Sequence, residues 1–406
     1  MRSEATKRSM LFFVNMSTNS VFARLAAKLD ELPHGFPSTE DGVELRILEK
    51  IFSPEDAEMA MHLRPIPETA EAISRRLARP VDELRVALDG MAERGQIFVF
   101  RQRSDKVYML APFIVGIYEF QLDRLDAELA AMFEEYVPTL LRTVGGSEPA
   151  LARVVPVNAR IDAHATVLRT DSLREMLAHA RSFRLAPCIC RREQALLGSP
   201  CTHPSETCLA FSNLENAYDD MPAWGRAITR DDAFAVLEMA EREGLVHTTY
   251  NVQRDQMFVC NCCSCCCGFL RALKEFGAPH LVVRSNYVSV IAAGDCSACG
   301  ECAGRCPMDA IVAQDDVFAV TDARCIGCGV CTLACPTAAI TLTPRPSPEQ
   351  TTPPKTLVAW AVKRSLHRRG ILRTAVQTGG LMVQILRNRR AARRHDPRDP
   401  GDPPRP

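Results

Sequence analysis

Two stretches of the chain repeat one arrangement of four cysteines followed by a proline. They read Cys296-Ser-Ala-Cys299-Gly-Glu-Cys302-Ala-Gly-Arg-Cys306-Pro307 and, 29 residues later, Cys325-Ile-Gly-Cys328-Gly-Val-Cys331-Thr-Leu-Ala-Cys335-Pro336. Thiolates at this short spacing can wrap one metal centre on a tight loop. Zinc also accepts four thiolates, but zinc sites usually show separated C-x2-C pairs rather than a run of four. The duplicated pattern therefore favours iron–sulfur clusters over zinc.

The two runs share the form C-x2-C-x2-C-x3-C-P. They resemble the bacterial two-cluster [4Fe–4S] ferredoxin module, in which the fourth cysteine of each run ligates the other cluster. The resemblance implies one cluster held by Cys296, Cys299, Cys302 and Cys335, and a second held by Cys325, Cys328, Cys331 and Cys306. Gly300 and Gly329 provide backbone freedom beside each cluster. Between the runs, Ile311 to Val320 is expected to form a hairpin that turns at residues 314–316.

Ten of the 18 cysteines lie ahead of these runs. They are Cys188, Cys190, Cys201, Cys208, Cys260, Cys262, Cys263, Cys265, Cys266 and Cys267. Two C-x-C pairs, at 188–190 and 260–262, each follow a β-like segment, and residues two apart in a strand share a face. If these strands pair, four thiols converge. The loop from Cys201 to Cys208 could then reach in toward them.

Four interpretations remain open for this second group. The neighbouring ferredoxin-like runs favour a third iron–sulfur cluster. Structural zinc, with His203 as one ligand, is an alternative. Thiol redox or sulfur-transfer chemistry is another, because cations such as Arg191 and Arg192 can lower a thiol pKa. Inert packing explains six cysteines within the eight residues 260–267 poorly. The spacing assigns none of the ligands individually.

The front of the chain has the element order of a winged helix-turn-helix domain. Apolar residues at helical spacing and a Ser53-Pro54 helix start precede a helix that ends at Gly95. The expected helices have apolar positions between 43 and 51, a start at residues 53–56, and spans over 67–77 and 81–94. The expected strands cover 97–100 and 107–110. A similar helix–glycine–strand unit recurs at Met239 to Val246 and leads toward the cysteines at 260–267. Residues 112–120 are expected to form a buried connector to a helix over 125–136.

DNA binding by this front unit is disfavoured by its charge. A recognition helix should present Arg, Lys, Asn or Gln to the bases, yet the exposed positions of residues 82–94 carry a net negative charge. Only Arg101, Arg103 and Lys106 in the expected wing favour phosphate contact. We therefore expect a structural or protein-docking role, with DNA as the weaker alternative.

The formal charge of zero conceals an acidic body and a basic tail. The first 354 residues contain 36 basic and 46 acidic side chains, and the rest contain 13 basic and 3 acidic ones. The tail has an apolar face at 381–386 followed by five arginines up to Arg394. It could contact a membrane surface, dock to an acidic partner, remain solvated or fold back onto the acidic body. Residues 395–406 are expected to be disordered.

The cysteine content and the lengths of the apolar runs predict the cellular compartment of the protein. The apolar run at 10–14 is too short for a secretory signal, and no stretch approaches the roughly 18 apolar residues of a membrane-spanning helix. Disulfide frameworks belong mostly to short secreted chains. A cytoplasmic, reducing location is therefore expected, with the thiols available for metal.

The chain of 406 residues is expected to be a multidomain α+β protein. The expected parts are an N-terminal extension and helix (1–40), a winged-helix-like domain (41–140), a cysteine-rich second winged-helix-like region (150–285), a dicluster ferredoxin domain (286–343), and a linker with a basic helical tail (344–406). No phosphate loop, dinucleotide-binding turn or nucleophile elbow is present, so no catalytic residue is assigned.

Four segments extend the resemblance to the whole chain. They are Glu44 to Leu48, Pro112 to Phe120, Ala186 to Arg191 and Cys260 to Gly268. The chain is similar here to a group of poorly characterised prokaryotic 4Fe–4S proteins with a winged-helix-like front, from which no reaction can be transferred. We expect an electron carrier or the redox subunit of an oxidoreductase, working with redox partner proteins. The alternative is a redox-sensing regulator that binds DNA or a protein through the winged helix.

Overall fold

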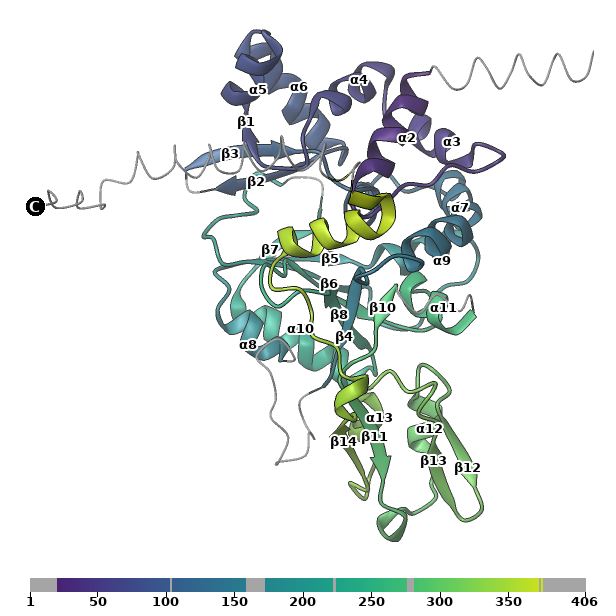
Figure 1. The fold of residues 1–406 in the computed structure, drawn as a ribbon. Coiled ribbons are helices and arrows are strands. Elements are labelled where there is room, and N and C mark those ends of the chain that lie inside the picture. The colour runs from purple at the N-terminus through teal and green to yellow at the C-terminus, as the bar shows by residue number, and fades with distance from the viewer. Residues whose placement is uncertain are drawn as a thin grey trace, which may run out of the picture.

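The structure is a computed structural model that describes residues 20–102, 104–157, 172–221, 224–275, 281–371 and residue 374. Helices and sheets are mixed throughout, in agreement with the α+β expectation. Figure 1 shows a helical front unit, a central sheet with helices around it, and a smaller module that projects from one end of the sheet. No described helix is long and apolar enough to cross a membrane.

The helices and the hairpin of the front unit occur in the expected order, but a short strand at 68–69 replaces the start of the helix expected over 67–77. Ser53 caps helix α4, because its Oγ accepts a hydrogen bond of 3.1 Å from the Asp56 amide. Pro54 occupies the first helical position. A small antiparallel sheet of order β1-β3-β2 follows the helices. The elements are α2 (Val21–Glu31), α3 (Val43–Ile51), α4 (Pro54–His62), β1 (Glu68–Thr69), α5 (Ala70–Leu77), α6 (Val81–Glu93), β2 (Phe98–Gln102) and β3 (Asp105–Met109).

The connector after β3 is buried, as expected. The π-type turn η1 (Phe113–Ile117) and the 3-10 turn η2 (Glu119–Gln121) lead into α7 (Ala127–Gly145). Tyr118 stacks on Phe133 with ring centroids 3.6 Å apart, and Phe113 packs against the same aromatic group. These contacts fix α7 against the connector.

The middle of the chain forms one seven-stranded sheet of order β10-β4-β8-β9-β6-β5-β7. All neighbouring strands are antiparallel except β10 and β4, which are parallel. The helix–glycine–strand unit is present as α10, Gly244 and β8, but its hairpin β8–β9 lies within this large sheet rather than forming a small wing. The elements are β4 (Ala152–Val155), α8 (Leu173–Ala178), β5 (Ser182–Pro187), α9 (Ile189–Leu196), β6 (Glu206–Ser212), β7 (Arg226–Ile228), α10 (Arg230–Arg242), β8 (Val246–Tyr250), β9 (Phe258–Cys262), α11 (Gly268–Glu275) and β10 (Val282–Val283).

The projecting module consists of two strand pairs, two short α-helices and two 3-10 turns. The expected hairpin between the cysteine runs is confirmed, with its strands over 311–314 and 317–320. The other pair joins the two ends of the module, with Tyr287 opposite Pro344. The elements are β11 (Tyr287–Ile291), η5 (Ala293–Asp295), α12 (Glu301–Arg305), β12 (Ile311–Gln314), β13 (Val317–Val320), α13 (Val330–Ala334), β14 (Ile340–Pro344) and η6 (Ser347–Glu349).

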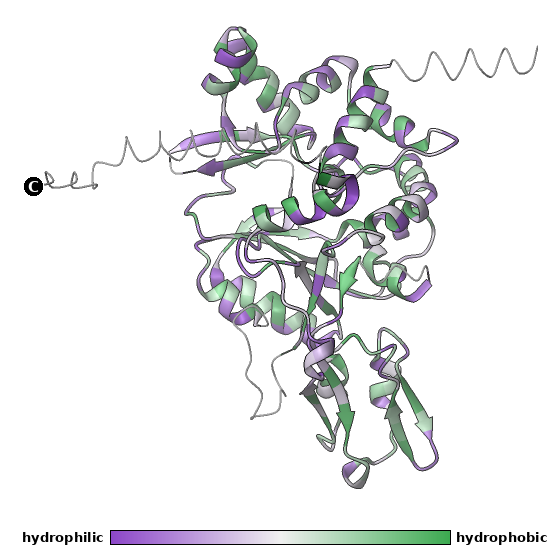
Figure 2. Cartoon of the chain, viewed as in Figure 1, coloured by the Kyte–Doolittle hydropathy of each residue, from purple (hydrophilic) through white to green (hydrophobic). Residues whose placement is uncertain are grey.

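The beginning of the basic tail folds back onto the body. Residues 357–371 form a helix, drawn in yellow in Figure 1, and Figure 2 shows hydrophobic and hydrophilic segments alternating along it. Trp360 is fully buried and its indole N–H donates to the Ala150 carbonyl at 2.8 Å. Arg368 and Arg369 both pair with Asp30 of α2. One face of this part of the tail is therefore docked on the body, while Val358, Leu366 and Ile371 of the same helix remain exposed. Residues 381–406 lie outside the described residues.

The tail helix also encloses His34, which predicts a pH dependence of stability. Its Nε2 lies 3.1 Å from the Tyr250 hydroxyl. Burial, and to a lesser extent the charges of Arg364 and Arg368, lower the pKa of His34 from 6.5 to about 3. The unfolded chain therefore binds a proton below pH 6.5 that the folded chain does not bind until about pH 3, so stability falls as the pH falls through this window.

We expect this histidine alone to cost about 1.4 kcal/mol between pH 7.5 and pH 5.5. Denaturant unfolding of the wild type and of His34→Gln at both pH values measures the effect, since glutamine does not titrate. The control is the exposed His179, as His179→Gln. Equal pH dependence in the wild type and His34→Gln would refute a neutral buried imidazole.

Candidate metal centres

Each cysteine run winds around a left-handed glycine. Gly300 and Gly329 precede α12 and α13 with φ of 78° and 77°, a conformation that glycine adopts without strain. The glycines therefore let the chain turn between the second and third cysteines of each run. This is the role that the sequence predicted for them.

The eight cysteines of the two runs line two separate cavities. One cavity is lined by Cys306, Cys325, Cys328 and Cys331, and the other by Cys296, Cys299, Cys302 and Cys335. We call them the proximal and the distal cavity, because the first lies against the body and the second lies toward the free end of the module. In each, three thiols come from one run and the fourth comes from the other, which is the exchange implied by the ferredoxin resemblance. The donors are all thiols, the ligand type that [4Fe–4S] clusters use.

The proximal cavity has three buried thiols and a fourth, that of Cys306, which is only partly buried. Cys325, Cys328 and Cys331 are all buried, and the Val157 amide donates to the Cys328 carbonyl at 2.9 Å. Burial raises the pKa of the Cys331 thiol to about 12, and it raises that of Cys328 well above its ordinary value. These thiols are therefore protonated when no metal is bound, and cluster binding must release their protons.

The distal cavity is open to solvent at one corner, where Cys299 is exposed.

A hydroxyl group lies beside one thiol of each cavity, and neither hydroxyl was identified from the sequence. Thr337 Oγ1 lies 3.6 Å from Cys335 Sγ, and Ser289 Oγ lies 3.2 Å from Cys331 Sγ. Such outer contacts tune the potential of a bound cluster. Ser289 belongs to β11, outside both cysteine runs, so the run pattern could not identify it.

The loop of the proximal cavity has no room for a side chain at Gly327. This residue has φ of 66°, and a Cβ there would collide with the Tyr287 carbonyl and the Ser285 hydroxyl. We expect Gly327→Ala to cost about 2 kcal/mol or more and to weaken cluster retention in the proximal cavity. Gly294→Ala is the matched control, because nothing lies within 4 Å of the position that its new methyl group would take. Thermal unfolding and iron content measure both variants, and equal behaviour would contradict the steric argument.

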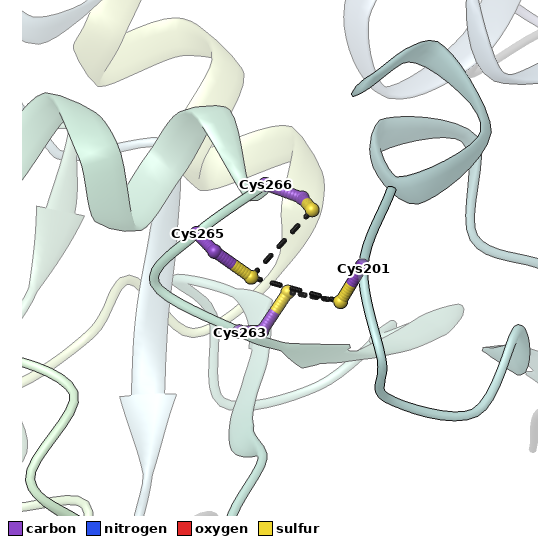
Figure 3. A group of neighbouring side chains, drawn as sticks. All are labelled: Cys201, Cys263, Cys265 and Cys266. Carbon is purple, nitrogen blue, oxygen red and sulfur yellow. Dashed lines mark hydrogen bonds between the residues drawn. The ribbon is translucent and has the colours of Figure 1, made fainter. Parts of the chain in front are cut away.

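Four of the other ten cysteines form a compact group. The sulfurs of Cys201, Cys263, Cys265 and Cys266 all lie within 4.8 Å of one another. Figure 3 shows the three from the turn after β9 facing Cys201, which comes from the loop before β6. Contacts of 3.7 Å and 3.6 Å join Cys201 to Cys263 and to Cys265, and a contact of 3.6 Å joins Cys265 to Cys266. We call this set the four-thiol group.

The spacing of the four-thiol group fits one tetrahedral metal ion. Four thiolates at about 2.3 Å from a central zinc lie about 3.8 Å from one another. In a [4Fe–4S] cube each thiolate binds a different iron, so the sulfurs are farther apart. A tetrahedral all-sulfur donor set indicates zinc or iron. His203 is not part of this group; its Nδ1 lies 4.0 Å from Glu243.

The remaining six cysteines lie on the neighbouring elements. The sequence suggested that both C-x-C pairs belong to strands, and that four thiols converge if those strands pair. Cys260 and Cys262 do lie on β9, whereas Cys188 caps α9, Cys190 lies in its first turn, and β6 separates β5 from β9. The thiols still converge, because β6 contributes Cys208 directly opposite Cys260 of β9. Cys262 follows on β9, and Cys267 precedes α11.

Arg191 interacts with thiols of both sets, Cys188 of the second set and Cys263 of the four-thiol group. Its side chain is buried, and it donates to the Pro204 carbonyl at 2.8 Å and to the Asn261 carbonyl at 3.0 Å. The pKa of the Cys263 thiol is lowered to about 4, first by a hydrogen bond from Cys266 and further by the Arg191 charge. The predicted effect of this cation on the thiols is therefore present.

The end of α10 joins the module to the four-thiol group. Arg305, the residue before Cys306, donates to the Glu241 carbonyl at 2.9 Å and also to the Arg242 carbonyl. On the other side, Ala240 and Leu245 pack against Cys263 and Cys266. Residues 240–245 therefore contact both the projecting module and the four-thiol group.

The comparison with protein families agrees with the geometry of the projecting module. Residues 287–340 match the family model of the 4Fe-4S dicluster domain. No curated protein and no solved structure matches the chain. The class that fold and site define is thus that of iron–sulfur proteins, and the match covers the module alone.

Proposed function

We propose that the protein transfers electrons through two [4Fe–4S] clusters in its projecting module, as a carrier or as the redox subunit of an oxidoreductase. Cys306, Cys325, Cys328 and Cys331 would hold the proximal cluster, and Cys296, Cys299, Cys302 and Cys335 would hold the distal one. Each cluster, when bound, accepts and gives up one electron. The observation that carries the proposal is the pair of cavities, each lined by three cysteines of one run and the fourth cysteine of the other.

The difference in exposure between the cavities supports a direction of transfer. The distal cavity has the exposed Cys299, so a redox partner protein would exchange electrons there. The proximal cavity has buried thiols and a backbone contact with the body. Because α10 contacts α13 beside the proximal cavity, electrons from this cluster would pass toward the cysteine-rich part of the sheet.

The four-thiol group is proposed as a separate tetrahedral site that binds zinc. It joins a loop that precedes β6 to the turn after β9, and would hold these elements in place. The sulfur–sulfur distances are close to those around one tetrahedral zinc ion. They therefore favour zinc over a third [4Fe–4S] cluster bound by these four thiols. A single zinc ion has no redox chemistry, so its role would be structural.

Anaerobic reduction of the full-length protein tests the electron-transfer proposal. We expect the module to accept two one-electron equivalents from dithionite and to return them to an oxidising dye, with electron paramagnetic resonance following the reduced clusters. Ser289→Ala should shift the midpoint of the proximal cluster without removing it, because it deletes only the hydroxyl near Cys331. Failure of a fully loaded protein to take up electrons would refute the proposal.

We do not expect the front unit to bind DNA. The amide of Arg101 donates to the Ala217 carbonyl at 2.8 Å, and its guanidinium pairs with Asp220, so the hairpin is docked on the body. Lys106 pairs with Asp89. Both described wing cations are therefore neutralised, and DNA affinity needs unpaired cations.

An anaerobic gel shift in oxidised and reduced protein should accordingly show no salt-sensitive binding to duplex DNA. Binding that weakens steeply with salt in either redox state would instead favour the regulator. Arg101→Ala with Lys106→Ala then serves as the matched control, since the double variant should lose any such binding.

A further inference from the structure

We propose that the six cysteines outside the four-thiol group bind a third iron–sulfur cluster within the central sheet. The set consists of Cys188, Cys190, Cys208, Cys260, Cys262 and Cys267, and we call it the six-thiol ring. The proposal goes beyond the electron-transfer function, because it assigns a cofactor to residues that neither the dicluster match nor the tetrahedral site includes.

The six thiols interact electrostatically with one another in a closed ring. Cys188 interacts with both Cys190 and Cys208, and Cys260 interacts with both Cys208 and Cys262. Cys267 closes the ring through its interactions with Cys190 and Cys262. Each thiol therefore has two sulfur neighbours. The six come from α9, β6, β9 and the start of α11, so the ring depends on the tertiary fold.

The register of the sheet explains why the thiols face one another. Cys208 and Cys260 are directly opposite on the antiparallel strands β6 and β9, so they share one face of the sheet. Cys262 is two residues farther along β9 and has the same orientation. Cys188 lies just past the end of β5, where Ala186 is opposite Cys208. The Thr248 hydroxyl of β8 lies 3.5 Å from Cys262 Sγ and flanks the ring.

The ring is more open than a site for single metal ions. Two zinc ions sharing thiolates would place at least three sulfurs within one tetrahedral edge of each other, about 3.8 Å. Among the described residues, the only sets of three or more ligand atoms that lie within 4.8 Å of one another are those of the four-thiol group. The ring thiols share this openness with the thiols of the two module cavities. Thiols that lie farther apart than around a single metal ion fit an iron–sulfur cluster, because its iron and sulfide atoms occupy the space between them.

The surroundings of the ring also suit a cluster. Cys188, Cys190, Cys208 and Cys260 are only partly buried, and the last three pack against the core. Arg191, which supplies positive charge next to Cys188, offsets part of the negative charge of a thiolate-bound cluster. A cube needs four thiolates, and the ring offers six, so the bound cluster has ligands in excess of one cube.

Metal and sulfide analysis of the anaerobically reconstituted full-length protein tests the proposal. We expect at least about twelve irons and twelve labile sulfides per chain, compared with about eight if only the module is loaded. The double variant Cys208→Ser/Cys260→Ser should lose at least about four irons and keep the resonance signals of the module. Ser264→Ala is the matched control in the turn beside the ring, and it should keep all of the iron because it removes no thiol.

The outcomes separate this proposal from the electron-transfer function. About eight irons in the wild type would overturn the third cluster and leave the module intact, and this readout does not depend on the folding of any variant. Wild-type iron content in a folded Cys208→Ser/Cys260→Ser protein would overturn it as well. Additional iron that is lost with the double variant, with the module spectra unchanged, is the result that the ring predicts.

Discussion

Cys328→Ser is expected to remove the proximal cluster and about four of the irons bound by the module. The Cys328 thiol is buried, and burial holds its pKa well above the ordinary value. A serine hydroxyl is a much weaker ligand for iron than a thiolate and leaves a polar group in a buried cavity. Because the backbone of Cys328 also contacts Val157, we expect the thermal unfolding temperature to fall together with the iron content.

Cys299→Ser is the matched variant for the distal cavity. Its side chain is exposed, so losing the thiol should remove distal iron with a smaller effect on stability. Resonance spectra of the two reduced variants should each retain one of the two cluster signals of the wild type. If both variants lost the same signal, the assignment of the eight cysteines to two cavities would be wrong.

Arg364→Ala is expected to cost about 3 kcal/mol or more in the free energy of unfolding. The guanidinium is fully buried in the tail helix. It donates to the carbonyls of Pro33 at 2.9 Å and Pro149 at 2.7 Å, and to two more at the end of α7, those of Val144 and Ser147. Alanine would leave these acceptors without their donor in a dry site.

The neighbouring Lys363 gives a direct control, because its side chain is exposed. Lys363→Ala removes the same charge from the same helix and should change stability by no more than about 0.5 kcal/mol. Chemical denaturation of both variants at pH 7 compares them. A similar small loss in both would mean that the tail helix does not hold the front unit to the sheet.

The features that could be predicted from the sequence depend on neighbouring residues. The hairpin over 311–320, the Ser53 cap and the left-handed glycines at 300 and 329 are all set within one turn of chain. The two cysteine runs belong with these features, because a short fixed spacing determines which thiols can reach one centre.

The division of the other ten cysteines could not be predicted, because it depends on the order of strands in the sheet. Insertion of β6 between β5 and β9 brings Cys208 beside Cys260 and leaves Cys201 for the four-thiol group. Cys263 and Cys262 are adjacent in the sequence, yet they belong to different sets because the chain turns between them. A pattern of spacings carries no information about such long-range pairing.

The position of the tail helix also could not be predicted from the sequence pattern. Its arginines could equally have been solvated, since charged side chains usually remain at the surface. Burial of Arg364 is possible only because the end of α7 and the Pro33 region present carbonyls in one place. The charge difference between body and tail indicated an attraction without identifying these acceptors.

The most direct test of the central claim compares the iron and labile sulfide of the wild type with those of Cys299→Ser/Cys328→Ser. Both proteins are prepared without oxygen, and circular dichroism checks that the variant is folded. Two [4Fe–4S] clusters in the module predict that the variant loses about eight irons and eight sulfides per chain. Equal iron in both proteins, or zinc in place of iron in the wild-type module, would contradict the assignment.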